Sequence, residues 1–256
     1  MNNIVWFRTV FKKYVDKFYG KDEYLNTNIK IKEEHTLRVC KNIRKISYSL
    51  NSTEQDMCLS EIIALFHDIG RFEQIVKYRT FNDKLSEDHA ELGIKVIEKE
   101  GFFQSLNPDL KNICINAILY HNKKNLYESD PNDKTILFSK MIRDADKMDI
   151  LKVLTNYYDS DNSSNPALVL DLSDNNKISY TLLNNFLEGN KLDSAMLKTK
   201  SDFKILMLSW AFDLNFDFTK KYIFKNGYFE KIIETLPDNS PKNEIRQVVK
   251  KAIYAI

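Results

Sequence analysis

The chain has 256 residues, of which 43% are hydrophobic and 12% aromatic, so it can bury a substantial core. Its 38 basic and 36 acidic residues nearly balance, and no basic block with interleaved aromatics indicates a surface for nucleic acid. No apolar run approaches the roughly 18 residues that cross a membrane, and the three cysteines form no Cys-x-x-Cys pair. We therefore expect a cytoplasmic globular protein that binds neither nucleic acid nor a membrane.

The spacing of apolar residues predicts an all-α fold. Only six glycines and five prolines interrupt the chain, and apolar residues recur mostly three and four positions apart. In chain order, we predict helices at about residues 4–19, 28–50, 55–69, 86–100, 109–122, 133–155, 179–188, 202–214, 217–236 and 241–255. Ser86 and Asp202 are the expected N-caps of their helices, Gly101 ends the helix that Ser86 begins, and Ser240 with Pro241 begins the last helix.

A polar segment rich in helix breakers, from Tyr158 to Pro166, is the clearest candidate for a domain boundary. Every histidine precedes this segment and none follows it. We therefore predict a helical core over residues 1–157, with residues 158–256 as a helical C-terminal extension packed on that core.

The four histidines occupy the same kind of position, since each continues an apolar row on its predicted helix. They are His35, His67, His89 and His121. His121, for example, extends the row of Cys114, Ala117 and Ile118 at spacings of three and four. A single inward histidine is usually a core residue with a satisfied hydrogen bond, but four of four indicate a shared centre. Imidazole is the commonest side-chain metal ligand near neutral pH, so we predict a metal site.

Asp68 directly follows His67 in the stretch ALFHDIGRFEQ, at the inner end of an apolar helix. A buried carboxylate needs a compensating charge, and the run that precedes Asp68 contains no Lys or Arg. A bound cation supplies that charge. Neighbouring helical positions diverge by about 100°, so the two side chains are expected to reach two adjacent ions, with the carboxylate of Asp68 bridging them.

The segment IRDADKMDIL offers three further carboxylates, at Asp144, Asp146 and Asp149. Asp144 has lysines at i−4 and i+3, so a solvated ion-pair role accounts for it. Asp146 instead has isoleucines at i−4 and i+4, a setting in which an ionised carboxylate needs a metal. We predict Asp146 as the ligand and keep Asp144 as the alternative, because a small error in helix phase would turn Asp144 inward.

His35, the adjacent His67 and Asp68, and the DADKMD segment resemble the HD-domain superfamily of metal-dependent phosphohydrolases over about residues 25–155. The motifs SEDHAELG and ILYHNKKN, which contain His89 and His121, are similar to those of its two-metal members, including cyclic-dinucleotide phosphodiesterases and mixed-valent di-iron oxygenases. The resemblance implies an HD-domain helical bundle followed by additional C-terminal helices. It implies one metal ion held by His35, His67, Asp68 and Asp146, and a second held by Asp68, His89 and His121. The Gly-Tyr-Pro signature of the cyclic-di-GMP phosphodiesterase branch is absent.

A site with these ligands supports phosphoester hydrolysis. Two divalent ions can activate water and stabilise a phosphoryl group, and imidazole and carboxylate ligands suit Mn, Fe, Zn, Co or Ni. The substrate that we expect is a small phosphorylated molecule, a nucleotide or cyclic dinucleotide. Two other functions use the same ligands: a di-iron oxygenase, and a regulator that senses a nucleotide without catalysis.

Asp68 and Arg71 are the candidate catalytic residues. The guanidinium of Arg71, three residues beyond Asp68, is suited to clamp a substrate phosphate. The alternative is that Arg71 is an ordinary partner of Glu73 or Glu87. Two further cations are weaker candidates for phosphate binding, namely Arg38 and Lys123.

Overall fold

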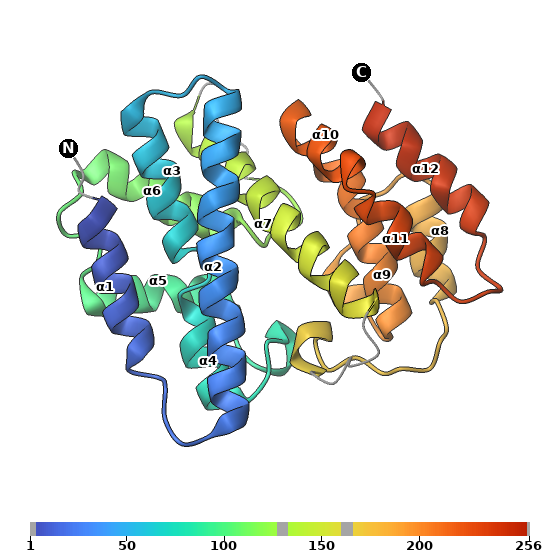
Figure 1. The fold of residues 1–256 in the computed structure, drawn as a ribbon, viewed down its shortest axis with the longest axis horizontal. Coiled ribbons are helices and arrows are strands. Elements are labelled where there is room, and N and C mark those ends of the chain that lie inside the picture. Colours follow the sequence, from blue (N-terminus) through green and yellow to red (C-terminus); the bar gives the residue numbers. More distant parts are fainter. Residues whose placement is uncertain (1–3, 127–132, 160–165, 255–256) are drawn as a thin grey trace. The chain divides into compact units, whose positions relative to one another are not determined.

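The computed structural model describes residues 4–126, 133–159 and 166–254, and Figure 1 shows their arrangement as a ribbon. The described residues form helices and no β-strand, with one isolated bridge between Ser173 and Thr199. The predicted all-α class is therefore confirmed. Among the same residues, no helix is both long enough and apolar enough to cross a membrane.

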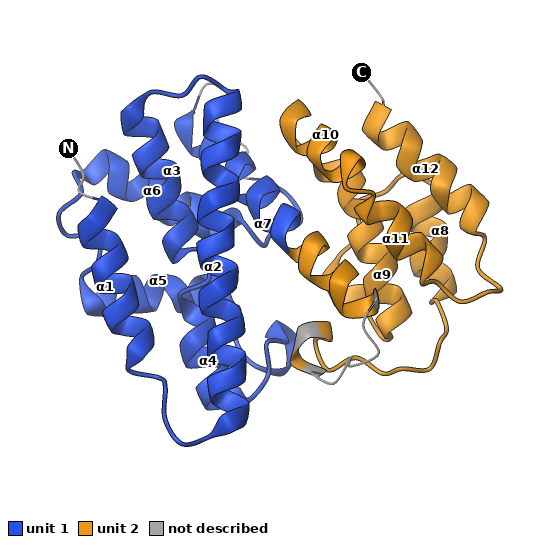
Figure 2. Cartoon of the chain, in the orientation of Figure 1, with its two compact units in different colours: residues 1–149 blue, residues 150–256 orange. Residues whose placement is uncertain are grey.

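The chain forms two compact units, coloured blue and orange in Figure 2. The first unit is Met1–Asp149 and contains α1 to α6 and the first part of α7. These helices are α1 (Ile4–Asp16), α2 (Glu23–Ser49), α3 (Glu54–Phe66), α4 (Gly70–Tyr78), α5 (His89–Glu100), α6 (Pro108–Tyr120) and α7 (Lys134–Asp159), with a 3-10 helix η1 at Asp83–Leu85. Helix α2 packs against α3 and α4, α3 also packs against α1 and α6, and α5 packs against α4 and α6. Their apolar faces enclose a core that includes Phe66, Phe72 and Phe103.

The second unit is Ile150–Ile256, and its described residues contain the rest of α7 and five further α-helices. These are α8 (Tyr180–Leu187), α9 (Lys200–Ser209), α10 (Asp217–Lys225), α11 (Tyr228–Glu234) and α12 (Lys242–Tyr254). Helix α8 packs against α9 and α12, and α11 packs against α9, α10 and α12. The division between the units falls inside α7, whereas the sequence places a domain boundary after residue 157, near the end of the same helix.

Two predicted N-caps are wrong, and in each case a neighbouring side chain caps the helix. Asp88 begins α5, because its Oδ1 accepts hydrogen bonds from the backbone N–H groups of the next turn. Ser86 instead accepts a hydrogen bond from Gln74 at 2.8 Å. Thr199 caps α9, and Asp202 is the third helical residue, whose carboxylate completes a capping box.

Two other predictions about the helices differ from the structure. The range predicted as one helix over 217–236 is divided into α10 and α11, because Gly227 adopts a left-handed φ of 64°. Helix α4 was not predicted, although it follows the His-Asp pair directly. The predicted end of α5 is confirmed, since Gly101 is its left-handed C-cap, with φ 69°. The last helix was predicted to reach residue 255, which lies outside the described residues.

Candidate metal centre

Helices α2 and α3 place the first three of the predicted ligands. His35 lies in the middle of α2 and is buried. Helix α3 begins at a Thr53 cap and is apolar over its last residues, which directs its C-terminal end into the core. The helix ends at Phe66, so that His67 is its C-cap and Asp68 follows in the turn, both of them buried.

Gly70, two residues beyond Asp68, explains how the next histidine reaches this point. It begins α4 where α4 meets the start of α5, and a Cβ atom on Gly70 would lie 2.4 Å from the carbonyl oxygen of His89 and 2.6 Å from the backbone nitrogen of Gly93. Only a residue without a side chain permits this approach. The glycine after the His-Asp pair therefore brings His89, at the start of α5, next to Asp68.

The end of α6 is fastened to the start of α5, which places the fourth histidine. His121 is the C-cap of α6, and Lys123, two residues later, donates a hydrogen bond to Asp88 at 2.7 Å. From α7, Arg143 donates to the carbonyl oxygens of His121 at 3.3 Å and of Lys123. These contacts hold His89 and His121 side by side, with 3.1 Å between their Nε2 atoms.

The Nδ1 atom of each histidine has an acceptor on the protein. The partners are Asp149 Oδ2 for His35 (2.7 Å), Ala64 O for His67 (2.7 Å), Asp83 Oδ2 for His89 (2.7 Å) and Ile118 O for His121 (2.6 Å). A backbone carbonyl only accepts, so the Nδ1 atoms of His67 and His121 each carry a proton. Protein acceptors of this kind fix the tautomer and the ring orientation of metal-binding histidines.

Asp68 lies between two pairs of histidines. Its Oδ2 atom is 3.6 Å from Nε2 of His35 and 3.7 Å from Nε2 of His67. Its Oδ1 atom is 3.4 Å from Nε2 of His89 and 3.9 Å from Nε2 of His121. Each carboxylate oxygen of Asp68 therefore faces a different pair of imidazoles.

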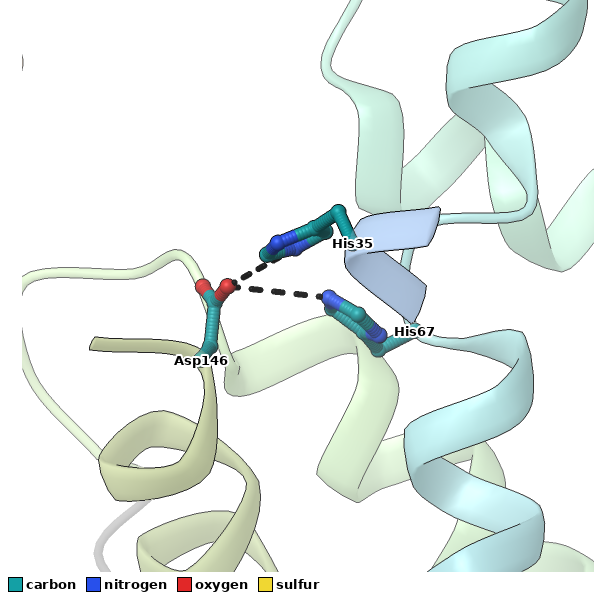
Figure 3. Close-up of side chains that lie close together, drawn as sticks. All are labelled: His35, His67 and Asp146. Atoms are coloured by element: carbon teal, nitrogen blue, oxygen red, sulfur yellow. Dashed lines mark ion pairs between the residues drawn. The ribbon is translucent and has the colours of Figure 1, made fainter. Parts of the chain in front are cut away.

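Asp146 joins the first of these pairs. Its Oδ1 atom lies 3.1 Å from Nε2 of His35 and 3.8 Å from Nε2 of His67, and the three side chains point toward one another in Figure 3. The structure thus brings together all six residues predicted as ligands, which we call the histidine–aspartate centre: His35, His67, Asp68, His89, His121 and Asp146.

The residues of the histidine–aspartate centre fit a metal ion. Nε2 of His35, Nε2 of His67 and Oδ1 of Asp146 are buried and have no hydrogen-bond partner among the described residues, although the first and last are only 3.1 Å apart. Atoms about 2.0–2.2 Å from a shared ion lie roughly 3.0–3.4 Å from one another, close to the separations seen here. Three polar atoms that converge in a buried place without hydrogen-bond partners are suited to a bound cation, and imidazole with carboxylate suits a divalent transition metal.

The second pair of histidines is also suited to a bound cation. Burial, together with the nearby His89 and His67, lowers the pKa of His121 to about 3, so its ring is neutral at physiological pH. Because Nδ1 of His121 carries the proton, its Nε2 can only accept. The 3.1 Å contact with Nε2 of His89 therefore needs either a proton on His89 or a cation between the two rings.

Both carboxylates of the histidine–aspartate centre are ionised. Burial opposes ionisation of Asp68, but the charge of Lys32 and the neighbouring His67 outweigh it and hold the Asp68 pKa well below its usual range. Burial likewise opposes ionisation of Asp146, and its contacts with His35 and His67 hold that pKa well below the usual range. Two negative charges are thus present for a cation.

Sequence reasoning did not assign roles to two carboxylates that orient the ligands. Asp149 accepts from Nδ1 of His35 and also from Nε of Arg38, both at 2.7 Å. Asp83, in η1, accepts from His89 at 2.7 Å. Asp149 could have been found, since it is three residues beyond Asp146 on one helix. Asp83 lies outside any periodic segment and carries no comparable signal.

A third residue without a sequence-based role is Lys32, which lies three residues before His35 on α2. Its Nζ atom is 2.8 Å from Oδ2 of Asp68. The spacing of Lys32 and His35 places both side chains on the same face of the helix, which is the signal that could have identified Lys32.

The expectation that Asp144 is solvated is wrong, since its exposed fraction is 0%. The neighbouring Lys147 on α7 is also buried, so lysines at helical spacing do not mark a solvent-facing side there. Asp146 is the carboxylate of this segment that faces His35 and His67, and 18% of its side chain is exposed.

The guanidinium of Arg71 contacts protein groups through both its Nη1 and its Nε atom. Its Nη1 atom donates to Gln74, to the carbonyl oxygen of Phe81 and to Asp83, at 2.7, 2.6 and 2.8 Å, and its Nε atom lies 3.6 Å from Oδ1 of Asp68. Its carboxylate partners among the described residues are therefore Asp83 and Asp68, and its action on a substrate phosphate stays a prediction.

The two weaker candidates for phosphate binding also contact carboxylates. Arg38 donates to Asp149 at 2.7 Å, and Lys123 donates to Asp88 at 2.7 Å and to Glu91 at 3.3 Å.

Comparison with known families agrees with this geometry. The family model described as "HD domain" matches residues 33–187, which is more than half of the chain and includes the whole histidine–aspartate centre. No match was found among curated proteins or among solved structures. The matched range and the His-Asp cluster inside it show that the chain belongs to the HD domain family.

Proposed function

We propose that the protein is a metal-dependent phosphohydrolase, a phosphomonoesterase or phosphodiesterase, whose histidine–aspartate centre holds two divalent ions. Membership of the HD domain family supports the hydrolase class, because the family suggests the superfamily of metal-dependent phosphohydrolases. The observation that carries the proposal is the position of Asp68, whose two oxygens face separate histidine pairs at 3.4 to 3.9 Å. A carboxylate placed in this way can bridge two ions.

The chain's own residues prepare the site for this chemistry. Two divalent ions, when bound, supply Lewis acidity toward a phosphoryl group and a nucleophile at neutral pH. Asp149 and Asp83 fix the rings of His35 and His89 through hydrogen bonds of 2.7 Å and increase their basicity as ligands.

The charges beside Asp68 favour an anionic substrate. Lys32 lies 2.8 Å from Oδ2 and Arg71 3.6 Å from Oδ1 of Asp68, so a cation lies beside each of its carboxylate oxygens. A hydrolase needs such charges to stabilise the phosphoryl oxygens in the transition state. We therefore propose a small phosphorylated substrate, with nucleotides and cyclic dinucleotides as the class to test first.

The test is a hydrolysis assay without oxygen. The protein is loaded with Mn²⁺ or Co²⁺ in place of iron and incubated with nucleotides, cyclic dinucleotides and simple phosphomonoesters. We expect release of phosphate or of a nucleoside monophosphate, loss of this activity in Asp68→Ala, and no loss in Asp109→Ala, an exposed residue on α6.

Two other results would contradict the proposal. Strict dependence on iron and oxygen, with no phosphoester cleaved, would indicate an oxygenase. Tight binding of a nucleotide without turnover under any metal would indicate a regulator.

A further inference from the structure

Lys32 has donors that the protein does not use. Its Nζ atom donates to Oδ2 of Asp68 at 2.8 Å and lies 5.2 Å from the centre of the Phe81 ring. An ammonium group has three N–H donors, and Asp68 is the one hydrogen-bond acceptor that the described residues provide for it. Two donors therefore remain for a group outside the protein.

The other cations near the histidine–aspartate centre are held by protein partners. Arg71 has three acceptors on Nη1, and its Nε, which has no hydrogen-bond partner among the described residues, is buried 3.6 Å from Oδ1 of Asp68. Arg38 has two hydrogen bonds to Asp149. Arg143 donates to three backbone carbonyl groups at the end of α6. Lys123 pairs with Asp88 and Glu91, on the outer side of α5. Lys32 thus differs from Arg71 in two ways: it donates a hydrogen bond to Asp68, and its unused donors are on a side chain that is 17% exposed, against 11% for Arg71.

Lys32 also lies where the histidine–aspartate centre reaches solvent. The side chains of Lys32 and Asp146 are 17% and 18% exposed, whereas those of His67 and Asp68 are 0% and 4% exposed. A substrate must enter where the centre is exposed, and it would meet Lys32 there. The ammonium is a compact point charge that suits a phosphate oxygen.

We propose that Lys32 is the residue that recognises the phosphate group of the substrate and positions it beside Asp68, an inference that rests on the proposed phosphohydrolase function. The ammonium keeps its contact with Oδ2 of Asp68 and directs its remaining N–H donors to a non-bridging phosphate oxygen. The same charge discriminates against neutral substrates, which offer no anion to Lys32. Lys32 is therefore a positioning residue that determines specificity for anionic substrates.

The test measures binding of inorganic phosphate to the Mn²⁺-loaded protein by calorimetry, together with metal content by elemental analysis. We expect Lys32→Met to retain its Mn²⁺ and to bind phosphate roughly 10- to 100-fold more weakly, the loss typical of a hydrogen bond to a charged group. Lys32→Arg should recover most of the affinity, because the charge is retained. Lys30→Met is the matched control, since Lys30 is exposed on the same helix, and it should bind as the wild type does.

On a substrate that the wild type hydrolyses, Lys32→Met should raise KM by a larger factor than it lowers kcat. Equal phosphate affinity in Lys32→Met and the wild type, at full metal content, would overturn the inference, as would absence of phosphate binding by the loaded wild type. Loss of Mn²⁺ in both Lys32→Met and Lys32→Gln would overturn it too, because Lys32 would then serve only to hold Asp68. Failure of the proposed function looks different: the wild type would hydrolyse nothing while its phosphate binding still depended on Lys32, which would support the binding role.

Discussion

Oδ2 of Asp149 lies 2.7 Å from Nδ1 of His35, and Nε of Arg38 donates to the other oxygen of the same carboxylate at 2.7 Å. Burial opposes ionisation of Asp149, but these two partners outweigh it and hold its pKa below the ordinary value. An ionised Asp149 thus holds the ring of His35 with Nε2 turned toward Asp68 and Asp146.

We expect Asp149→Asn to weaken binding of one metal ion by about 10- to 100-fold, the effect usual for removing the carboxylate behind a metal-binding histidine. The affinity of the chelator-treated protein for Mn²⁺ or Zn²⁺ measures this, with circular dichroism as a control for folding. The second ion should be affected less, because its candidate ligands do not contact Asp149. Unchanged affinity for both ions would show that His35 is not a ligand.

Arg71 contacts the second histidine pair through a carboxylate, as Arg38 contacts His35 through Asp149. It donates to Asp83 at 2.8 Å, and Asp83 in turn holds Nδ1 of His89 at 2.7 Å. We expect Arg71→Ala to lower the affinity for the metal ion near His89 by roughly 10-fold, because Asp83 then lacks the positive charge that holds it in place. The affinity for the ion near His35 should be unchanged. Metal titrations that resolve two ions measure this. If Arg71→Ala instead keeps both ions and raises KM for phosphorylated substrates, Arg71 has the phosphate-clamping role that its place in the sequence predicts.

Much of the histidine–aspartate centre follows from the sequence because its candidate ligands lie on helices or directly at their ends. A ligand that continues an apolar row must turn inward, and all four histidines and Asp68 are buried as expected. The helical phase of Asp146 relative to its isoleucine neighbours placed it on the side that meets His35 and His67.

What sequence reasoning missed depends on contacts between segments far apart in the chain. The packing of η1 brings Asp83 to His89, and the packing of α2 brings Lys32 to Asp68, and no local sequence pattern indicates either contact. The prediction for Asp144 is wrong because the spacing of lysines along α7 does not show that the helix is buried on that side. Tertiary packing decides these cases and local periodicity does not.

Gly70 is expected to be indispensable for packing. A Cβ atom there would lie 2.4 Å from the carbonyl oxygen of His89, and backbone at this distance cannot move aside without shifting a helix. We expect Gly70→Ala to lower the free energy of unfolding by about 1–3 kcal/mol, the usual cost of overpacking. Gly20→Ala is the control, since nothing lies within 4 Å of its added Cβ atom, and its change should stay within about 0.5 kcal/mol. Urea unfolding of both variants measures the difference, and equal stability would contradict the close approach of α4 and α5.

The stability of the metal-free protein should depend on pH through the protonation of His35. Burial and the nearby Lys32 oppose its protonation, but Asp146 and Asp149 outweigh them and raise its pKa above the ordinary value. A histidine with a raised pKa in the folded state stabilises the fold below its unfolded pKa of about 6.5, and this contribution is lost as pH rises through the folded pKa. In the presence of chelator, we therefore expect the free energy of unfolding to fall across that range in the wild type and to fall less in His35→Asn. Urea unfolding at a series of pH values measures the two slopes, and equal slopes would exclude His35 as their cause.

The most direct test of the two-ion centre is the number of ions bound per chain after reconstitution, measured by plasma mass spectrometry. We expect close to two divalent transition-metal ions in the wild type. Asp146→Asn and His121→Ala each remove a ligand from a different group, so we expect each variant to retain about one ion, and Asp68→Ala to retain the least. A wild-type protein that binds no transition metal under these conditions, or the same two ions in all three variants, would contradict the assignment of the histidine–aspartate centre as a two-metal site.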